Sequence, residues 1–181
     1  MLTEITPLLL TYNQAPNLDR VLQKLKWASR VLVLDSFSTD ETGIIASRFP
    51  NVVFLQRKFD SFAGQCNFGL EQIESAWVLS LDADYLLTDE LRSEIAQLAP
   101  EPEIVAYFAR FRYCVAGRPL LGSLYPPRAV LFRKSQGHYV QDGHAHRLVF
   151  DGPSRFLKGK IWHDDRKPLT RLHDRRSTRV C

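Results

Sequence analysis

The chain has 181 residues, of which 45% are hydrophobic and 24% charged, a composition typical of one globular domain with a substantial core. The net charge of +4 is modest, and six basic residues against one acid crowd into 166–179, so we expect no nucleic-acid partner. The three cysteines are widely spaced, which argues against a disulfide framework. The chain shows no signal-peptide pattern, and no apolar run approaches the ~20 residues of a membrane-spanning helix. We therefore expect a cytoplasmic or peripheral protein.

The first half of the chain alternates between strand-like and helix-like segments. Apolar runs predict four short strands at 5–11, 31–34, 52–55 and 76–81. Helices are expected between them: one from Pro16 to Leu25, one opened by the capping-box pattern at 38–41 and ending near Arg48, one from about 61 to 74, and one capped by Thr88. This alternation indicates right-handed crossovers and a mostly parallel sheet.

Beyond Pro102 the sequence loses its helical spacing. Strand-like runs at 104–113, 129–132, 148–150 and 156–162 are separated by turns and proline-rich loops. No long linker divides the two halves, so we expect these segments to add mixed or antiparallel strands to the same sheet.

Polar side chains follow each of the first four predicted strands. In chain order they are Tyr12 and Asn13, then Asp35, Ser36 and Ser38, then Arg57 and Lys58, then Asp82 and Asp84. Ligands bind at the carboxyl ends of strands in an open parallel sheet, so these side chains are expected at one binding edge.

The pair Asp82 and Asp84 is the sharpest feature of this edge. Two carboxylates directly after a buried strand can hold one Mn²⁺ or Mg²⁺ ion together with diphosphate oxygens, and that ion would neutralise charge on a departing nucleoside diphosphate. A solvated turn is the competing interpretation. Asp35 likewise has two interpretations: it accepts hydrogen bonds from a base or ribose, or it caps the following helix. The glycine patterns of Rossmann dinucleotide sites and of P-loops are absent.

Four stretches carry a resemblance to a known family: Pro7 to Asn13 (PLLLTYN), Val33 to Thr42 (VLDSFSTDET), Phe62 to Asn67 (FAGQCN) and Leu81 to Asp84 (LDAD). In this order they resemble family 2 glycosyltransferases, nearest to the branch with the lipopolysaccharide-core β-glucosyltransferases. The similarity continues through GRP at 117–119, YPP at 125–127, LFR at 131–133, DGH at 142–144 and WHDDR at 162–166, and covers about residues 3–168. It implies an α/β GT-A fold with a mostly parallel central sheet and mixed strands in the second half.

The resemblance also implies roles for individual residues. The expected nucleotide-sugar-binding residues are Thr11, Tyr12, Asn13, Asp35, Ser36, Asn67, Asp82 and Arg133. The expected metal ligands are Asp82, Asp84 and His163, and the expected general base is Asp142. A structural role for His163 is the alternative, and Asp164 and Asp165 compete with Asp142 unless they pair with Arg166 and Lys167. The spacing of His144, His146 and His163 matches no zinc pattern.

The implied organisation is one domain over 1–168, with a nucleotide-binding half at 1–102 and an acceptor-side half at 103–168, followed by a disordered or truncated basic tail at 169–181. Three residues depart from the family pattern. Cys66 replaces a basic residue beside the asparagine, Tyr85 replaces an acid, and His146 replaces a glutamate. The tail departs as well, because relatives continue past residue 168 with helices.

The leading hypothesis is an inverting, metal-dependent transfer of a sugar from a nucleoside-diphosphate sugar, by family preference a UDP-sugar, to a hydroxyl of a lipid-linked or envelope saccharide. Such an acceptor would be met at the inner face of the cytoplasmic membrane, where the basic tail would favour peripheral contact. One alternative is a catalytically impaired or truncated domain that binds a sugar nucleotide. A nucleotidyltransferase ranks lower, because 11–16 lacks a glycine-rich basic loop. The base, the sugar and the oligomeric state are left open.

Overall fold

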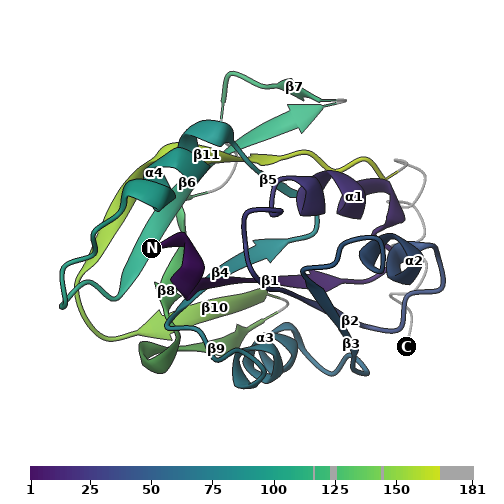
Figure 1. Ribbon diagram of the computed structural model, residues 1–181, viewed down its shortest axis with the longest axis horizontal. Helices are drawn as coiled ribbons and strands as arrows, with labels where there is room; N and C mark the ends of the chain where they lie inside the picture. The colour runs from purple at the N-terminus through teal and green to yellow at the C-terminus, as the bar shows by residue number, and fades with distance from the viewer. Residues whose placement is uncertain (116, 123–125, 144, 168–181) are drawn as a thin grey trace.

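A strongly curved sheet organises the part of the chain that the computed structural model describes, residues 1–115, 117–122, 126–143 and 145–167. Its strand order is β3-β2-β1-β4-β8-β6-β11-β5, with β7 paired to β6 (Figure 1). The strands are β1 Ile5–Thr11, β2 Val31–Asp35, β3 Val52–Gln56, β4 Trp77–Asp82, β5 Tyr85–Leu87, β6 Ala106–Val115, β7 Arg118–Pro119, β8 Arg128–Arg133 and β11 Ser154–His163. The predicted tail at 169–181, Tyr125 and His144 lie outside the described residues.

The first four long strands run parallel, as their alternation with helices predicts. β1 pairs with β2 and β4, and β2 pairs with β3, all in parallel. β8 then runs antiparallel to both β4 and β6, while β11 is parallel to β6 and antiparallel to β5. The second half therefore adds mixed strands to the same sheet.

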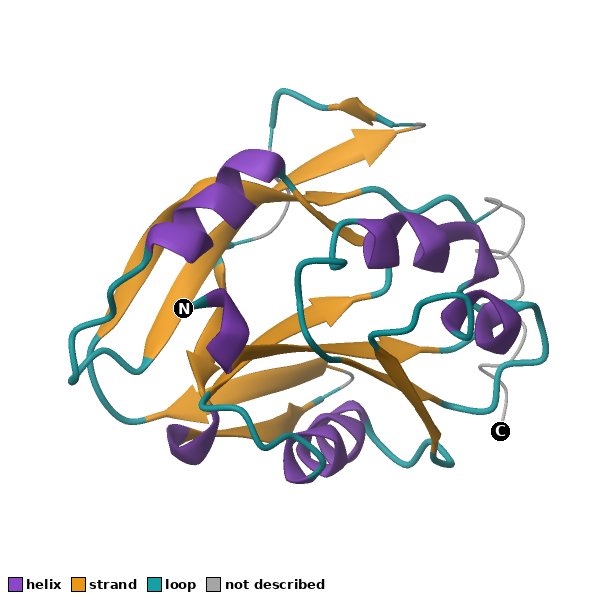
Figure 2. Cartoon of the chain, viewed as in Figure 1, coloured by secondary structure: helices purple, strands orange, loops and turns teal. Residues whose placement is uncertain are grey.

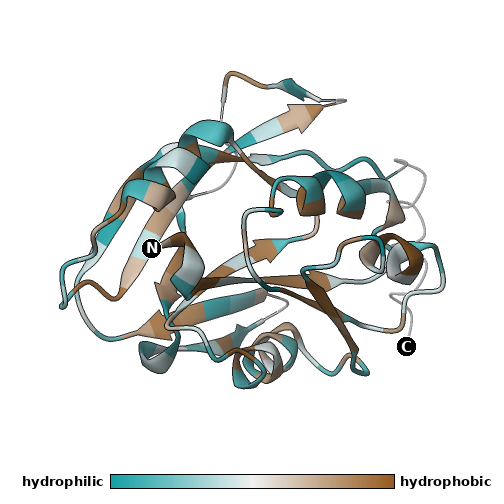
Figure 3. Cartoon of the chain, viewed as in Figure 1, coloured by the Kyte–Doolittle hydropathy of each residue, from teal (hydrophilic) through white to brown (hydrophobic). Residues whose placement is uncertain are grey.

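Helices cover the sheet on two sides (Figures 1 and 2). In chain order they are α1 Ala15–Gln23, α2 Thr42–Ala46, α3 Phe62–Glu71 and α4 Asp89–Gln97. One apolar cluster unites α1, α2 and α4 with one sheet face, and a second unites α3 with the other face. The brown central strands of Figure 3 lie between these layers, since strands buried on both faces are apolar throughout.

A hairpin outside the main sheet is the chief departure from the predicted architecture. β9 (Gly137–Asp142) and β10 (Ala145–Phe150) pair only with each other, and the hairpin packs beside α3. The expectation that the strand at 148–150 joins the main sheet is therefore wrong. The sequence also did not indicate β5, β7 or β9, because each is short or lacks a clear apolar alternation.

The segment 38–42 supplies hydrogen-bond acceptors to the start of α1. The predicted capping box is wrong, because α2 starts at Thr42 and has no side-chain N-cap bond. Instead Asp40 Oδ2 accepts the amide of Ala15 at 3.1 Å, and Thr42 Oγ1 accepts the amide of Gln14 at 2.8 Å. The free N–H groups at the start of α1 lie beside this loop and need acceptors there. The loops after β1 and β2 are thus held together at the carboxyl edge of the sheet.

Candidate functional site

The carboxylate of Asp84 meets the imidazole of His163 at the carboxyl end of β4. A two-residue turn joins β4 to β5, and β5 pairs antiparallel with the end of β11, so that Tyr85 lies opposite His163. This pairing places His163 Nε2 3.2 Å from Asp84 Oδ2. The amide of Asp164 donates to the carbonyl of Asp84 at 3.0 Å and holds the two segments together.

The Asp84 side chain has a free ligand position. Its Oδ1 atom is buried and has no hydrogen-bond partner among the described residues. A buried carboxylate oxygen without a donor is costly unless a cation or another group binds it. Within the described residues no three His, Cys, Asp or Glu side chains gather tightly enough to hold an ion on their own. This donor set fits Mn²⁺ or Mg²⁺ bound through one or two protein ligands and completed by substrate phosphates.

Burial and neighbouring charge shift the protonation of these groups. Burial raises the pKa of Asp82, and the charge of Asp84 raises it further. Burial lowers the pKa of His163, but its hydrogen bond to Asp84 and the charges of Asp84 and Asp82 outweigh this, and the pKa is raised overall. The charge of Asp84 thus disfavours ionisation of Asp82, and an added positive charge would relieve the repulsion.

A cavity of about 760 Å³ opens beside this turn at the carboxyl ends of β1, β2 and β4. Five of the predicted binding and metal residues line it: Thr11, Tyr12, Ser36, Asp82 and Asp84. Positive charge comes from Lys58, Arg128 and Lys167, and the ammonium of Lys167 donates to the carbonyl of Tyr12 at 3.3 Å. The cavity is therefore suited to an anionic ligand with a planar or apolar part.

A second cavity of about 580 Å³ lies between the β9–β10 hairpin and the sheet. It shares Asp82, Arg128, Ala145 and His146 with the first cavity, so the two meet at this wall. The predicted base Asp142 lines the second cavity with a side chain that is 69% exposed, 3.9 Å from Arg147. Two ligands could therefore approach each other across Asp82 and Arg128.

Two predicted nucleotide contacts are instead engaged within the loops. Asp35 is fully buried, and its carboxylate accepts bonds from Thr11, Ser38 and Gln56. Asn13 has a φ of 50° and accepts the amide of Thr39 at 2.9 Å. Neither side chain lines the cavity. Asp35 and Asn13 shape the rim that carries Tyr12 and Ser36.

Asn67 and Arg133 line neither cavity, and both side chains bond to other parts of the chain. The amide of Asn67 donates to the carbonyl of Tyr139 at 2.9 Å and accepts its N–H at 2.8 Å, which ties α3 to the hairpin. Arg133 pairs with Trp77 at the opposite end of β4, about 17 Å from Asp82 by strand length, and stacks over the Trp77 ring.

Cys66, which replaces a basic residue of the family pattern, is buried in the core beneath the hairpin. Burial raises the pKa of its thiol to about 12, so this thiol is chemically inert at neutral pH.

Arg128 is the functional candidate that the sequence analysis missed. Because β8 runs antiparallel to β4, continuing the register from Trp77 and Arg133 brings Arg128 level with Asp82. Its guanidinium donates to the Tyr85 hydroxyl at 3.3 Å, and it lines both cavities. In the sequence it is marked only as an arginine directly after two prolines. The direction of β8 is what places it beside the cavities.

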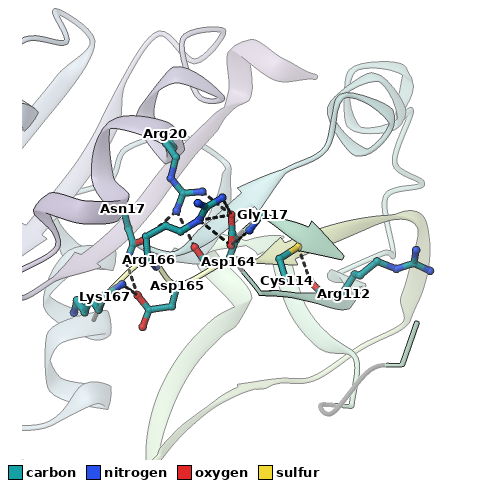
Figure 4. A network of polar contacts seen from close by, with 9 residues as sticks. All are labelled: Asn17, Arg20, Arg112, Cys114, Gly117, Asp164, Asp165, Arg166 and Lys167. Atoms are coloured by element: carbon teal, nitrogen blue, oxygen red, sulfur yellow. Dashed lines mark hydrogen bonds and ion pairs between the residues drawn. The ribbon is translucent and has the colours of Figure 1, made fainter. Parts of the chain in front are cut away.

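An ionic network around the buried carboxylate of Asp164 fixes the segment after β11, and it also engages the exposed residue Asp165 (Figure 4). Asp164 is 2% exposed and accepts from Arg20 at 2.7 Å and from Arg166 at 2.9 Å. Asp165 accepts from the Asn17 amide at 2.7 Å. The network anchors His163 and Lys167, which lie on either side of it, to α1.

Comparison with known proteins is consistent with this geometry. Residues 8–148 match the family model described as glycosyl transferase family 2. The lipopolysaccharide core biosynthesis glycosyltransferase LpsC of Rhizobium meliloti is 28% identical over 148 residues, which cover 75% of this chain and 53% of LpsC. Glycosyltransferase SunS of Bacillus subtilis is 34% identical over 98 residues, 52% of this chain and 23% of SunS. The chain thus spans about half the length, or less, of these relatives.

Solved structures agree on the fold. TarS of S. aureus in complex with UDP-GlcNAc superposes with a TM-score of 0.68 at 17% identity, over 91% of this chain and 59% of that one. Glucosyl-3-phosphoglycerate synthase of Mycobacterium tuberculosis was crystallised with Mn²⁺, UDP and phosphoglyceric acid. It superposes with a TM-score of 0.63 at 15% identity, over 93% of this chain and 73% of that one. These likenesses confirm the predicted GT-A fold. None of the described helices is long and apolar enough to cross a membrane.

Proposed function

Because the chain belongs to glycosyl transferase family 2, we propose that it transfers a sugar from a nucleoside-diphosphate sugar to a hydroxyl group of a saccharide acceptor, with inversion at the anomeric carbon. The observation that carries the proposal is the pair Asp84 and His163, 3.2 Å apart, beside a cavity that Asp82 also lines. Asp84 Oδ1 is buried there and has no hydrogen-bond partner in the described part of the chain. Such an edge suits a diphosphate together with a hard cation.

Mn²⁺ or Mg²⁺ would be held by Asp84 and His163, with Asp82 beside them, and would neutralise charge on the leaving diphosphate. The protein's own cations act in the same direction. Arg128 and Lys167 line the cavity from opposite segments of the chain and place positive charge where the diphosphate would lie. Tyr12, with a 56% exposed ring, offers a flat surface for a nucleobase.

The acceptor would approach from the second cavity, where Asp142 is proposed as general base. The acceptor oxygen forms a bond to the anomeric carbon, while the bond from that carbon to the diphosphate oxygen breaks. The electron pair of the broken bond leaves with the nucleoside diphosphate, and the hydroxyl proton passes to the Asp142 carboxylate. Attack opposite the leaving group needs no covalent nucleophile on the protein.

UDP is the proposed nucleotide, in line with two structural neighbours that were crystallised with UDP-GlcNAc and with UDP. A lipid-linked or envelope saccharide is the proposed acceptor, in line with the lipopolysaccharide core role named for LpsC. Its transfer would take place in the cytoplasm, with peripheral contact at the inner face of the membrane.

Calorimetric titration of UDP and GDP with Mn²⁺, and then with EDTA, tests the proposal. We expect UDP binding that depends on Mn²⁺ and is lost in Asp84→Ala, but retained in the control Asp89→Ala, which removes an exposed carboxylate from α4. Release of UDP from UDP-glucose or UDP-GlcNAc then tests transfer. A folded sample that binds neither nucleotide would overturn the proposal, and consumption of a triphosphate with pyrophosphate release would indicate a nucleotidyltransferase.

A further inference from the structure

One face of the strand pair β6–β11 carries alternating aromatic and basic side chains. The parallel register aligns them in three cross-strand pairs: Phe108 with Phe156, Arg110 with Lys160, and Arg112 with Trp162. We name these six residues the basic–aromatic strip. Residues 108, 110 and 112 share one face because side chains alternate along a strand, and the strip spans about 13 Å along β6. The opposite face of β6, with Tyr107, Ala109 and Phe111, packs into the core with Leu91 and Ile95 of α4.

No carboxylate among the described residues pairs with the cations of the strip. Among the described residues, Arg110, Arg112 and Lys160 form no ion pair with a carboxylate, whereas Arg155 on the same strand is paired with Glu101 at 2.7 Å. Arg110 and Lys160 are also direct neighbours across the two strands. Like charges in that arrangement are mutually destabilising. A bound anion would relieve this repulsion.

Aromatic contacts connect the strip to the second cavity. The Arg110 guanidinium lies 5.1 Å from the centre of the Phe156 ring, and the ring centres of Phe156 and Phe108 are 5.4 Å apart. The ring centres of Phe108 and of Phe150 in the hairpin are 6.2 Å apart. Phe108 and Phe150 both line the cavity that holds Asp142. A continuous surface therefore leads from the proposed reaction centre onto the strip.

We infer that the strip binds the part of the saccharide acceptor that extends beyond the reacting sugar, and that this part carries phosphate or carboxylate groups. This inference rests on the proposed function. The aromatic rings supply flat apolar surfaces for sugar rings, and the arginines supply forked donors for the anionic groups. The strip thereby selects an anionic oligosaccharide over a neutral one.

The shape of the strip favours an oligosaccharide over a membrane surface. It is a single row of side-chain pairs on two strands. Such a row suits a linear oligosaccharide that extends out of the second cavity. Only Phe156 among its aromatic residues is a strongly exposed large side chain, at 57%. Membrane-surface contact would call for a broader apolar face with basic residues around it.

Binding of defined oligosaccharides tests the inference. Tetragalacturonate and mannopentaose phosphate are the anionic probes, and maltotetraose is the neutral one, each followed by calorimetry and by Trp162 fluorescence assigned with Trp162→Phe. We expect the anionic probes to bind, more weakly as salt rises. The double variant Arg110→Glu/Arg112→Glu should weaken binding by roughly tenfold or more, because two charge-assisted contacts are reversed. Arg155→Gln is the matched control and should bind like the wild type.

UDP binding, measured on the same samples, separates this inference from the proposed function, because the strip variants should bind UDP as the wild type does. If the charge-reversed variant does not fold, Arg110→Gln/Arg112→Gln replaces it, with thermal unfolding as the check. Equal binding of maltotetraose and the anionic probes, or unchanged binding in the variants, would overturn the inference. The inference would also be overturned if the wild type bound none of the oligosaccharides but sedimented with phosphatidylglycerol vesicles in a way that depends on these arginines.

Discussion

The carboxylate of Asp84 and the imidazole of His163 lie 3.2 Å apart although 79 positions separate them in the chain. Their contact depends on the short antiparallel pairing of β5 with β11, which sets Tyr85 opposite His163. The last strand of the sheet thereby completes a site that begins at the end of β4. Replacing His163 therefore tests whether both halves of the chain contribute to binding the same ligand.

Replacing His163 should separate metal-dependent binding from folding. We expect His163→Phe to weaken Mn²⁺-dependent UDP binding by at least about 10- to 100-fold, because that range is found when only a group that supports a metal ligand is lost. The measurement is calorimetry at fixed Mn²⁺, and His138→Phe, an exposed position on β9, is the control. Equal affinity in wild type and His163→Phe would assign His163 a structural role.

The two arginines at the ends of β8 should differ in function. Arg128 lines both cavities, whereas Arg133 donates to the Ile104 carbonyl at 2.9 Å at the far end of the strand. We expect Arg128→Gln to weaken UDP binding by roughly tenfold, since a charge-assisted contact to the diphosphate is lost. Arg133→Gln should retain the wild-type affinity. Calorimetric titration of UDP into both variants measures the two affinities. A larger loss of affinity in Arg133→Gln than in Arg128→Gln would contradict the geometry.

Asn67 should matter for stability rather than for nucleotide affinity. Asn67→Ala removes both hydrogen bonds to the backbone of Tyr139 and leaves those groups unpaired, which should cost about 2 kcal/mol. Urea unfolding measures this loss, and hydrogen exchange should become faster at Tyr139. Asn67→Asp, which keeps the acceptor but not the donor, should be intermediate. A variant of full stability with weakened UDP binding would instead support the nucleotide-sugar-binding role expected from the sequence.

The buried carboxylate of Asp164 should contribute strongly to stability. Asp164→Asn leaves Arg20 and Arg166 without their shared partner and should cost about 3 kcal/mol, the lower end for a broken buried pair, because both arginines are partly exposed. Thermal and urea unfolding measure the change. Asp89→Asn, whose carboxylate pairs with Lys24 at the surface, is the matched control and should cost well under about 1 kcal/mol.

The same variant has a defined pH dependence. Burial raises the pKa of Asp164, but hydrogen bonds from Arg166 and Arg20 outweigh it and hold the pKa below its ordinary value. A depressed pKa means that the stabilisation is fully present above the unfolded value of about 4 and is lost as the pH falls through the folded value. The difference between wild type and Asp164→Asn should therefore be constant from about pH 5 to 8 and shrink in more acidic solution. A difference that grew below pH 4 would contradict the assignment.

Local sequence was sufficient for the elements whose signals are local. The apolar run at Ile5–Thr11 marked β1 with its observed bounds, and Thr88 caps α4 through the Leu91 amide at 3.2 Å, as expected. The parallel order of the first strands followed from their alternation with helices. It placed Tyr12, Ser36, Asp82 and Asp84 at one cavity, because the carboxyl ends of parallel strands share an edge.

The sequence by itself therefore determined the fold class, the family and the edge that carries the candidate site. Tertiary structure decided which polar residues reach that edge. Asp35 turns inward because Thr11, Ser38 and Gln56 donate to it, and Asn67 faces the hairpin instead of the cavity. Arg128 reaches the cavities and the predicted Arg133 does not, because β8 runs antiparallel to β4. Strand direction and pairing arise from contacts between distant segments, and no local pattern of residues encodes them.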